Sequence, residues 1–260
     1  MRRLRAFASV LPGEGMRFEL DAEESKHLAQ VLRVAPGQAL DVVDGEGSIA
    51  ECVVEESWKR GVALRVERLR RPGAPPPPLV LGVGLTKSDA FEDLIQRAVE
   101  LGATAFVPLA CDHSVVRLDA KREASRLERW RRIALAGLKQ CERLWGMEVA
   151  EPESLEQFAG RGEGALLALV ERADGTPDAG RTIAAAAPGP LRFCVGPEGG
   201  WSASERALLA ARAQPVSLGA AVLRTETAAL AALAAAALYR CSTLAQAPAS
   251  PPDKAVRHED

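Results

Sequence analysis

The segment that decides the fold reads Leu191-Arg-Phe-Cys-Val-Gly196-Pro-Glu-Gly-Gly200-Trp-Ser-Ala-Ser-Glu205. A second segment reads Val216-Ser-Leu-Gly219-Ala-Ala-Val-Leu-Arg224-Thr-Glu226-Thr-Ala228 and leads into an alanine-rich run. In both, an apolar strand runs into a glycine-bearing loop, and the loop leads into a helix. Ligands of open α/β sheets bind outside the carboxyl ends of the strands. The two loops therefore predict a ligand site at one edge of a sheet.

The first loop has the composition of a pocket built by backbone. Its three glycines leave no side chain between the main chain and a ligand, and Ser202 with Glu205 forms a capping box that starts the next helix. Glu198 lies inside the loop and would repel a phosphate. The loop thus favours a neutral nucleoside or a cationic ligand, although a tight strand-to-helix turn without a ligand is an alternative.

Composition places the chain among soluble globular proteins. It has 260 residues, 47% of them hydrophobic and 26% charged, with a formal net charge of -2. A nucleic-acid partner would have to be met by local basic patches. The five cysteines form no Cys-x-x-Cys pair, and no second ligand pair follows Cys111 and His113. This pattern of cysteines and histidines predicts reduced thiols and no metal. We also expect a cytoplasmic protein, because the apolar runs are too short to span a membrane.

Residues 1–71 predict a small, mainly β domain. Strands are expected at 39–44, 48–55 and 62–69, with a hairpin turn at Asp44–Gly47. A short helix is expected after Asp21, with Leu28, Val31 and Leu32 on one apolar face. The many basic residues indicate either a solvated face or contacts to an RNA backbone. The proline-rich stretch 72–78 predicts a semi-rigid linker.

Residues 79–246 predict an α/β domain. Strand-like runs at 79–85, 105–109, 166–170 and 191–195 alternate with helical ones, which include 91–101 and 120–145. This order is typical of a largely parallel sheet with helices on both faces. The arginines of 120–145 indicate either a solvated face or one that follows phosphates. The helix at 226–244 is apolar nearly all round and is expected to be buried, in part against a second subunit. We expect the tail 247–260 to be disordered.

Several common chemistries lack their motifs. Gly82-Val-Gly84-Leu-Thr-Lys87 lacks the third glycine of a dinucleotide fingerprint and the order of a P-loop. The chain has no Gly-x-Ser-x-Gly elbow and no His-Glu-x-x-His pair. The remaining charged candidates are Glu198, Arg224 and Glu226. Arg224 and Glu226 are either a capping ion pair or polar groups aimed into a pocket.

The two loop motifs identify a family. Gly196-Pro-Glu-Gly-Gly-Trp-Ser-x-x-Glu and Ser217-Leu-Gly-x-x-Val-Leu-Arg-Thr-Glu-Thr-Ala resemble the RsmE-type 16S ribosomal RNA uridine-N3 methyltransferases of the SPOUT superfamily. The resemblance covers almost the whole chain. It extends to the motifs His27-Leu-x-x-Val-Leu-Arg33 with Gly37, Lys87-Ser-Asp-x-x-Glu92, Glu100-Leu-Gly102 and Ser114-Val-Val-Arg117. The chain departs from the family at Ala221, where an arginine is usual, and at Lys139, where a glutamate is common.

The resemblance implies a fold, a cofactor and partners. The fold would be a PUA-like RNA-binding β-barrel at 1–71 and a SPOUT methyltransferase domain at 79–246, whose parallel sheet is tied in a trefoil knot. General experience of folds would not predict a knot. The cofactor would be S-adenosyl-L-methionine (SAM), the substrate 16S rRNA in the small ribosomal subunit, and the assembly a homodimer.

The resemblance also implies site residues. Arg224 would stabilise the developing uracil anion, and Glu226 would orient Arg224 or accept the proton. The expected cofactor-binding residues are Leu169, Val195, Gly196, Pro197, Glu198, Gly199, Gly200, Leu218, Gly219, Val222, Leu223, Arg224, Thr225, Thr227 and Ala228. The expected RNA-binding residues are Arg3, Arg5, His27, Arg33, Lys87 and Arg117.

Three other functions are compatible with parts of the sequence. A 2′-O-ribose methyltransferase would share the knot but not the arginine pattern or the N-terminal domain. A non-catalytic RNA-binding or ribosome-assembly protein would use the N-terminal domain alone, and the intact loops argue against it. A metabolite-binding α/β protein would have no affinity for rRNA.

Overall fold

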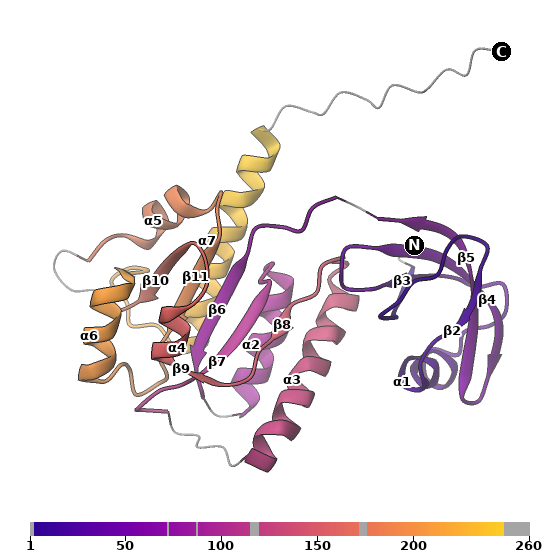
Figure 1. Cartoon of the computed structure of the whole chain (residues 1–260), viewed down its shortest axis with the longest axis horizontal. Helices are drawn as coiled ribbons and strands as arrows, with labels where there is room; N and C mark the ends of the chain where they lie inside the picture. Colours follow the sequence, from indigo (N-terminus) through magenta and orange to yellow (C-terminus); the bar gives the residue numbers. More distant parts are fainter. Residues whose placement is uncertain (1–2, 72, 87, 115–119, 172–175, 247–260) are drawn as a thin grey trace.

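The computed structural model describes residues 3–71, 73–86, 88–114, 120–171 and 176–246. Two domains lie side by side, and the longest helix of the C-terminal domain leads to the end of the chain (Figure 1). Pro72 of the predicted linker and the predicted tail at 247–260 lie outside the described residues.

The N-terminal domain is built on a five-stranded mixed sheet. Its order is β1-β3-β4-β5-β2, with β1 parallel to β3 and the other pairs antiparallel. The sheet encloses its own apolar core, which includes Leu28, Leu40 and Leu64. The elements are β1 (Leu4–Phe7), β2 (Arg17–Glu19), α1 (Ala22–Lys26), η1 (His27–Val31), β3 (Ala39–Val43), β4 (Ile49–Trp58) and β5 (Gly61–Arg70). The predicted strands are confirmed, and β1 and β2 are additional.

The predicted helix after Asp21 starts where expected, but Leu28, Val31 and Leu32 do not share one buried face. Asp21 accepts hydrogen bonds from the backbone N–H groups of Glu23 and Glu24, which caps α1. The next turn, η1, is a π-helix. Its wider turn carries Val31 away from the face of Leu28. Leu28 is buried, whereas Val31 is 66% exposed and Leu32 is 38% exposed.

The C-terminal domain is built on a parallel sheet. The strand order is β12-β10-β11-β6-β7-β8, with β9 also pairing with β7, and every pairing between these strands is parallel. Leu169 of β10 lies opposite both Val195 of β11 and Val216 of β12, so the carboxyl ends of these three strands are level. The strands are β6 (Leu79–Gly84), β7 (Ala105–Ala110), β8 (Glu148–Val149), β9 (Glu153–Ser154), β10 (Ala165–Leu169), β11 (Leu191–Val195) and β12 (Gln214–Val216).

Helices cover both faces of this sheet, as predicted. The larger core joins one face to α2, α3, α5 and α7, and a separate core joins the other face to α4 and α6. The helices are α2 (Ser88–Glu100), α3 (Ala120–Gln140), α4 (Leu155–Gly160), α5 (Ala179–Ala186), α6 (Ala203–Arg212) and α7 (Thr225–Gln246). Sequence patterns did not predict α4 or α5, which are short.

The helix predicted at 120–145 is shorter than expected, because α3 ends at Gln140. The turn that follows α3 contacts the N-terminal domain. The N–H of Gly47 donates to the carbonyl of Leu144 at 3.0 Å. A Cβ at Gly47 would lie 2.4 Å from the ring of Trp145, so this position requires glycine. The turn at Asp44–Gly47 is therefore a docking element as well as a hairpin.

A second contact between the domains explains one departure from the family pattern. Lys139 of α3 forms an ion pair with Glu24 of α1, whose side chain is buried. A glutamate at position 139 would place two carboxylates together at this interface. Val43 and Ile49 of the N-terminal domain join the large core of the C-terminal domain. The two domains are therefore packed against each other.

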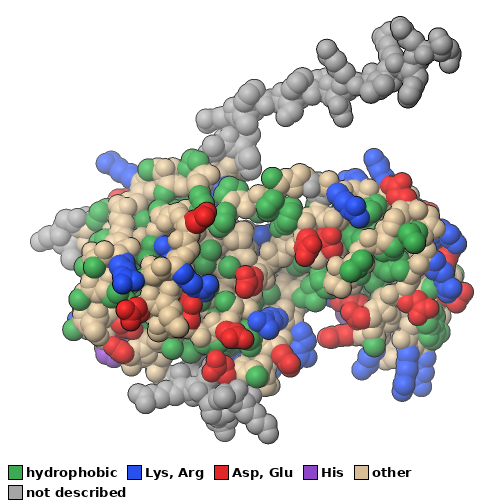
Figure 2. Space-filling view, viewed as in Figure 1, with side chains coloured by type: hydrophobic (Ala, Val, Ile, Leu, Met, Phe, Trp, Pro, Cys, Tyr) green, Lys and Arg blue, Asp and Glu red, His purple; other side chains and the backbone are tan. Residues whose placement is uncertain are grey.

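Charges of both signs are interspersed over the N-terminal domain (Figure 2). Arg3 pairs with Asp41 and Glu51, and Arg70 also pairs with Glu51. The basic composition of this domain is thus partly neutralised at its own surface. Among the described residues, no helix is both long enough and apolar enough to cross a membrane.

Candidate active site

A cavity of about 570 Å³ lies where the two glycine-bearing loops meet. It opens at the carboxyl ends of β10, β11 and β12, which is where open α/β sheets bind ligands. Its walls come from the loops after these strands, the loop after β7 and the start of α7. Its size is within the usual range for small-molecule sites, about 300–1,000 Å³.

The first loop is held from both sides. The indole of Trp201 would contact a Cβ at Gly196 at 3.2 Å, and its Nε1 donates to the carbonyl of Leu169 at 3.4 Å. The hydroxyl of Thr225, at the start of α7, donates to the carbonyl of Gly196 at 2.9 Å. The loop after β11 is therefore connected by hydrogen bonds to the end of β10 and to the start of α7.

Most of the predicted cofactor-binding residues surround this cavity. Those that line it are Leu169, Val195, Gly196, Pro197, Gly199, Gly200, Leu218, Gly219, Val222, Leu223, Thr225 and Ala228. Glu198, Arg224 and Thr227 are exposed and do not line it, and half-buried Glu226 does not line it either. Arg224 starts α7, since its carbonyl accepts from the N–H of Ala228 at 2.9 Å. The two predicted catalytic residues thus lie beside the cavity.

The remaining lining residues were not predicted. They are His113, Val170, Glu171, Thr176, Trp201, Arg206, Ser217 and Ala221. Trp201, Ser217 and Ala221 lie within the two motifs and Arg206 directly follows the first, so the full motifs with one further residue would have found these four. Val170, Glu171 and Thr176 follow β10, outside both motifs. His113 is different, because it lies about 80 residues upstream in the loop after β7. Its signal was its place directly after a strand of the parallel sheet.

The loop after β7 is fixed to the start of α6. Asp112 accepts hydrogen bonds from the hydroxyls of Ser202 at 2.5 Å and Ser204 at 3.1 Å. These two bonds lower the pKa of Asp112 below its ordinary value. Its backbone N–H donates at 3.0 Å to Glu205, whose other carboxylate oxygen completes the predicted capping box with Ser202.

His113 follows in the same loop and touches the glycine loop. Its Nδ1 lies 3.0 Å from the carbonyl oxygen of Gly199 and 3.2 Å from that of Gly200. A Cβ at Gly199 would lie 2.8 Å from the Cβ of His113, so glycine allows this close approach. The histidine therefore joins the loop after β7 to the loop after β11.

The predicted RNA-binding residues lie in several settings. His27 and Arg33 are exposed and flank the π-helical turn, and Arg33 has a φ of 52°. Arg3 forms ion pairs with Asp41 and Glu51. Arg5 is half-buried and donates a hydrogen bond to the carbonyl of Arg143 at 3.2 Å. Lys87 and Arg117 lie outside the described residues.

Burial disfavours the thiolate form of three cysteines. Burial raises the pKa of Cys52 and of Cys194 to about 12, and it also raises the pKa of Cys111. A thiolate is the nucleophilic and metal-binding form of cysteine. No group of three or more His, Cys, Asp or Glu in the described part of the chain could hold a metal ion.

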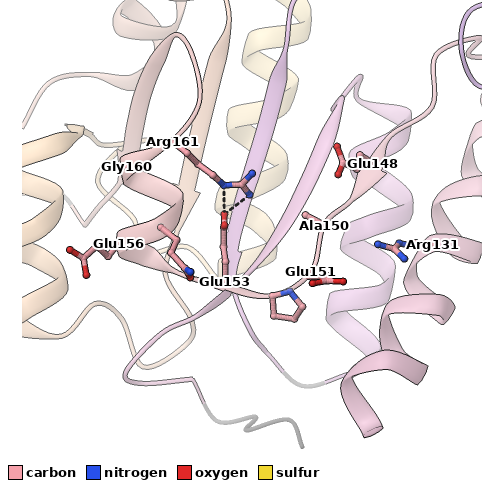
Figure 3. A pocket seen from close by; sticks show the side chains of 10 residues that line it. Arg131, Glu148, Ala150, Glu151, Glu153, Glu156, Gly160 and Arg161 are labelled. Atoms are coloured by element: carbon pink, nitrogen blue, oxygen red, sulfur yellow. Dashed lines mark hydrogen bonds and ion pairs between the residues drawn. The ribbon is translucent and has the colours of Figure 1, made fainter. Parts of the chain in front are cut away.

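A second, larger hollow of about 810 Å³ lies along the edge strands β8 and β9 and helix α4 (Figure 3). Charged side chains line it, and Arg161 pairs with Glu153 at 2.6 Å inside it. Its lining includes Glu148, Glu151, Glu153, Glu156, Arg131 and Arg161. Negative charge prevails there, and none of the predicted site residues lines it.

Comparison with protein families agrees with this architecture. Residues 74–237 match the model of an RNA methyltransferase domain, and residues 20–67 match that of an RNA methyltransferase PUA domain. The fold and the site thus define an RNA methyltransferase with a PUA-like N-terminal domain. The chain belongs to the RsmE-type family of small-subunit ribosomal RNA methyltransferases, as its similarity to curated members shows.

Two curated relatives illustrate this membership. The ribosomal RNA small subunit methyltransferase E of Mycobacterium tuberculosis is 36% identical over 88% of this chain and 89% of its own. The protein of the same name from Bacillus subtilis is 32% identical over 85% of this chain and 90% of its own.

Solved structures share the fold. A ribosomal RNA small subunit methyltransferase E from Neisseria gonorrhoeae, bound to S-adenosyl methionine, has a TM-score of 0.81 and 29% identity. The match covers 90% of this chain and 96% of that one. A methyltransferase from Legionella pneumophila, in complex with SAM, has a TM-score of 0.83 and 27% identity, over 93% of this chain and 98% of that one.

Proposed function

We propose that this protein transfers a methyl group from SAM to N3 of a uridine in the 16S rRNA of the small ribosomal subunit. The observation that carries the proposal is the cavity between the two glycine-bearing loops, at the level carboxyl ends of β10, β11 and β12. Two relatives with this fold are described with SAM bound. We also propose that the reaction takes place in the cytoplasm, because its substrate would be ribosomal RNA.

The cavity suits SAM in size and in lining. Its walls are mainly backbone and apolar side chains, and glycines at Gly196, Gly199 and Gly219 leave main-chain groups open to a ligand. Short-range donors and acceptors of this kind fit an adenine ring. The described residues that line the cavity include no cluster of basic side chains of the kind that binds a phosphate. Residues of the loops after β11 and β12 would hold the cofactor, which supplies an activated methyl group.

Arg224 and Glu226 have supporting roles in this proposal. Arg224 lies exposed at the start of α7, next to cavity-lining Leu223 and Thr225. A cation there would stabilise the negative charge that develops on the uracil ring. Glu226, half-buried two residues further on, would orient Arg224. The target uridine would leave its stack to reach the cavity.

The N-terminal domain offers a surface for RNA around the π-helical turn. The side chain of Gln30 donates to the carbonyl of Lys59 at 2.9 Å, which brings the turn beside the β4–β5 hairpin. Trp58 in this hairpin is 41% exposed and is followed by exposed Lys59 and Arg60. An exposed aromatic ring among cations suits unstacked bases and phosphates. Ultraviolet crosslinks from bound rRNA should map to this surface, and crosslinks confined to the C-terminal domain would contradict it.

We further propose that a second copy of the chain covers the loop before α7. Val222 and Leu223 line the cavity and are 76% and 37% exposed. Complete burial of a fully exposed side chain of this size stabilises an interface by about 1.5–3 kcal/mol, so Val222 would contribute most of that amount and Leu223 about a third of it. Val222→Asp should raise the dimer dissociation constant at least about tenfold, as measured by sedimentation.

The matched control for the dimer is Val10→Asp. Val10 is 75% exposed, as Val222 is, but it lies in the N-terminal domain and not beside the cavity. Equal dissociation of the two variants, or a native chain that sediments as a monomer at high concentration, would contradict the assembly.

The activity is tested by transfer of a labelled methyl group from SAM to small ribosomal subunits that lack the modification. Digestion and mass spectrometry then identify the labelled nucleoside. The expected product is N3-methyluridine. Label on a ribose 2′-oxygen would keep the fold and overturn the substrate chemistry, and absence of label from competent subunits would indicate a binding protein.

A further inference from the structure

We propose that His113 is the general base that removes the N3 proton of the target uracil through its Nε2. The inference rests on the proposed function, because it assigns one step of that reaction. It stands on the position of His113 in the wall of the cavity and on its contacts to the glycine loop.

The contacts of Nδ1 determine which ring nitrogen carries the proton. Both partners of Nδ1 are backbone carbonyl oxygens, of Gly199 and Gly200, and carbonyl oxygens only accept hydrogen bonds. Nδ1 must therefore be the donor. A neutral imidazole has one proton to share between its nitrogens, so Nε2 of His113 carries a free electron pair. Nε2 has no hydrogen-bond partner among the described residues.

The side chain of His113 is exposed, and contacts on two sides hold its ring. Asp112, its direct neighbour, is fixed by three hydrogen bonds to the first turn of α6 and its cap. On the other side, the two carbonyl groups that orient the ring belong to the glycine loop of the same cavity. A base that is oriented through its second nitrogen is the usual arrangement in enzymes that use histidine.

The other polar side chains of the cavity suit this role less well. Arg206 is a cation without an acceptor atom, and its guanidinium donates to the carbonyl of Trp201. Glu171 lines the cavity and is exposed, but within the described part of the chain no hydrogen bond fixes the orientation of its carboxylate. Glu226 does not line the cavity. Imidazole is also the side chain most often used for proton abstraction.

The proposed step is balanced. The N3–H bond of uracil breaks as an N–H bond forms on Nε2. The electron pair left on N3 forms the bond to the methyl carbon, and the pair of the broken carbon–sulfur bond stays on sulfur. The imidazolium then returns its proton to water. No oxidant, reductant or metal is needed.

Two substitutions separate a base from a structural support. In His113→Asn, the side-chain amide nitrogen takes the place of Nδ1 and can still donate to the two carbonyls, while Nε2 is lost. In His113→Ala, both are lost. If His113 is the base, both variants should lose about 100-fold or more in kcat, with SAM affinity in His113→Asn close to that of the native chain. Added imidazole should restore part of the turnover of His113→Ala.

A measurement without catalysis tests the tautomer directly. Nuclear magnetic resonance of the ¹⁵N-labelled protein without ligands should show the proton of neutral His113 on Nδ1. A proton on Nε2 would overturn the inference, because Nε2 could then not accept the uracil proton.

The remaining outcomes distinguish this inference from the proposed function. If the native chain forms N3-methyluridine and His113→Asn retains its turnover, the base assignment is wrong and the proposed function stands. Loss of turnover in Glu171→Gln with retention in His113→Asn would transfer the role to Glu171. A native chain that forms no N3-methyluridine on competent subunits would remove the proposed function and this step together.

Discussion

The two hollows of the C-terminal domain differ in what builds them. The larger one, about 810 Å³, is lined by charged side chains on the edge strands and α4. The smaller one, about 570 Å³, is lined mainly by backbone and apolar groups at the level ends of three parallel strands. Any solvated edge can carry charges, whereas a wall of backbone needs glycines and aligned strand ends. The position of a hollow at the carboxyl ends of parallel strands therefore indicates the ligand site better than the volume of the hollow does.

If the smaller cavity is the active site, the largest difference in turnover is expected between substitutions of one arginine beside each hollow. Arg224→Ala, beside the smaller cavity, should lower kcat by about 100- to 1,000-fold, as removal of a preorganised charge-stabilising donor does. SAM affinity should be unchanged, because Arg224 does not line the cavity. Arg161→Ala in the larger hollow is the matched control and should keep its turnover. Equal loss of SAM affinity and turnover in Arg224→Ala would contradict the role given to Arg224.

A smaller effect is expected from one added methyl group. Gly199→Ala places a Cβ 2.8 Å from the Cβ of His113 and 3.2 Å from its carbonyl oxygen, so the two loops must separate. The Kd for SAM, measured by calorimetry, should rise about tenfold or more, which is about 1.4 kcal/mol.

Gly160→Ala is the matched substitution in the larger hollow. Its Cβ would meet only a guanidinium nitrogen of Arg212 at 3.1 Å, and this flexible side chain can move. It should leave the Kd for SAM unchanged. The same rise in Kd for both variants would show that the distinction between the hollows is wrong.

The smallest effect concerns acid stability near the smaller cavity. Hydrogen bonds from Ser202 and Ser204 lower the pKa of Asp112 below 3.8. The carboxylate is thus favoured in the folded state, and its contribution to stability is present above pH 3.8 and lost as the pH falls through the lowered pKa. Denaturant unfolding should show Asp112→Asn to be less stable than the native chain at pH 7. The difference should become smaller at pH 3, and one that grows toward acid would contradict this account.

Local chemistry made part of the fold predictable. The strand at Leu191–Val195 and the helix after Ser202 follow directly from an apolar run and a capping box, and both are confirmed. Val31 and Leu32 were misplaced because a π-helical turn breaks the period of 3.6 residues on which the prediction relied. The end of α3 was misplaced because Trp145 packs on Gly47, a contact between residues almost 100 positions apart.

The sequence by itself determined the two glycine-bearing loops, their strands and helices, and the family, because these depend on residues that are neighbours along the chain. Only the tertiary structure decided that the loop after β7 closes the same cavity, that Arg224 and Glu226 lie beside it and that Lys139 meets Glu24. Parallel strands bring together loops that are far apart in sequence, and no local pattern records which side chains then face each other. His113 is the clearest case, since its partners Gly199 and Gly200 are 86 and 87 positions away.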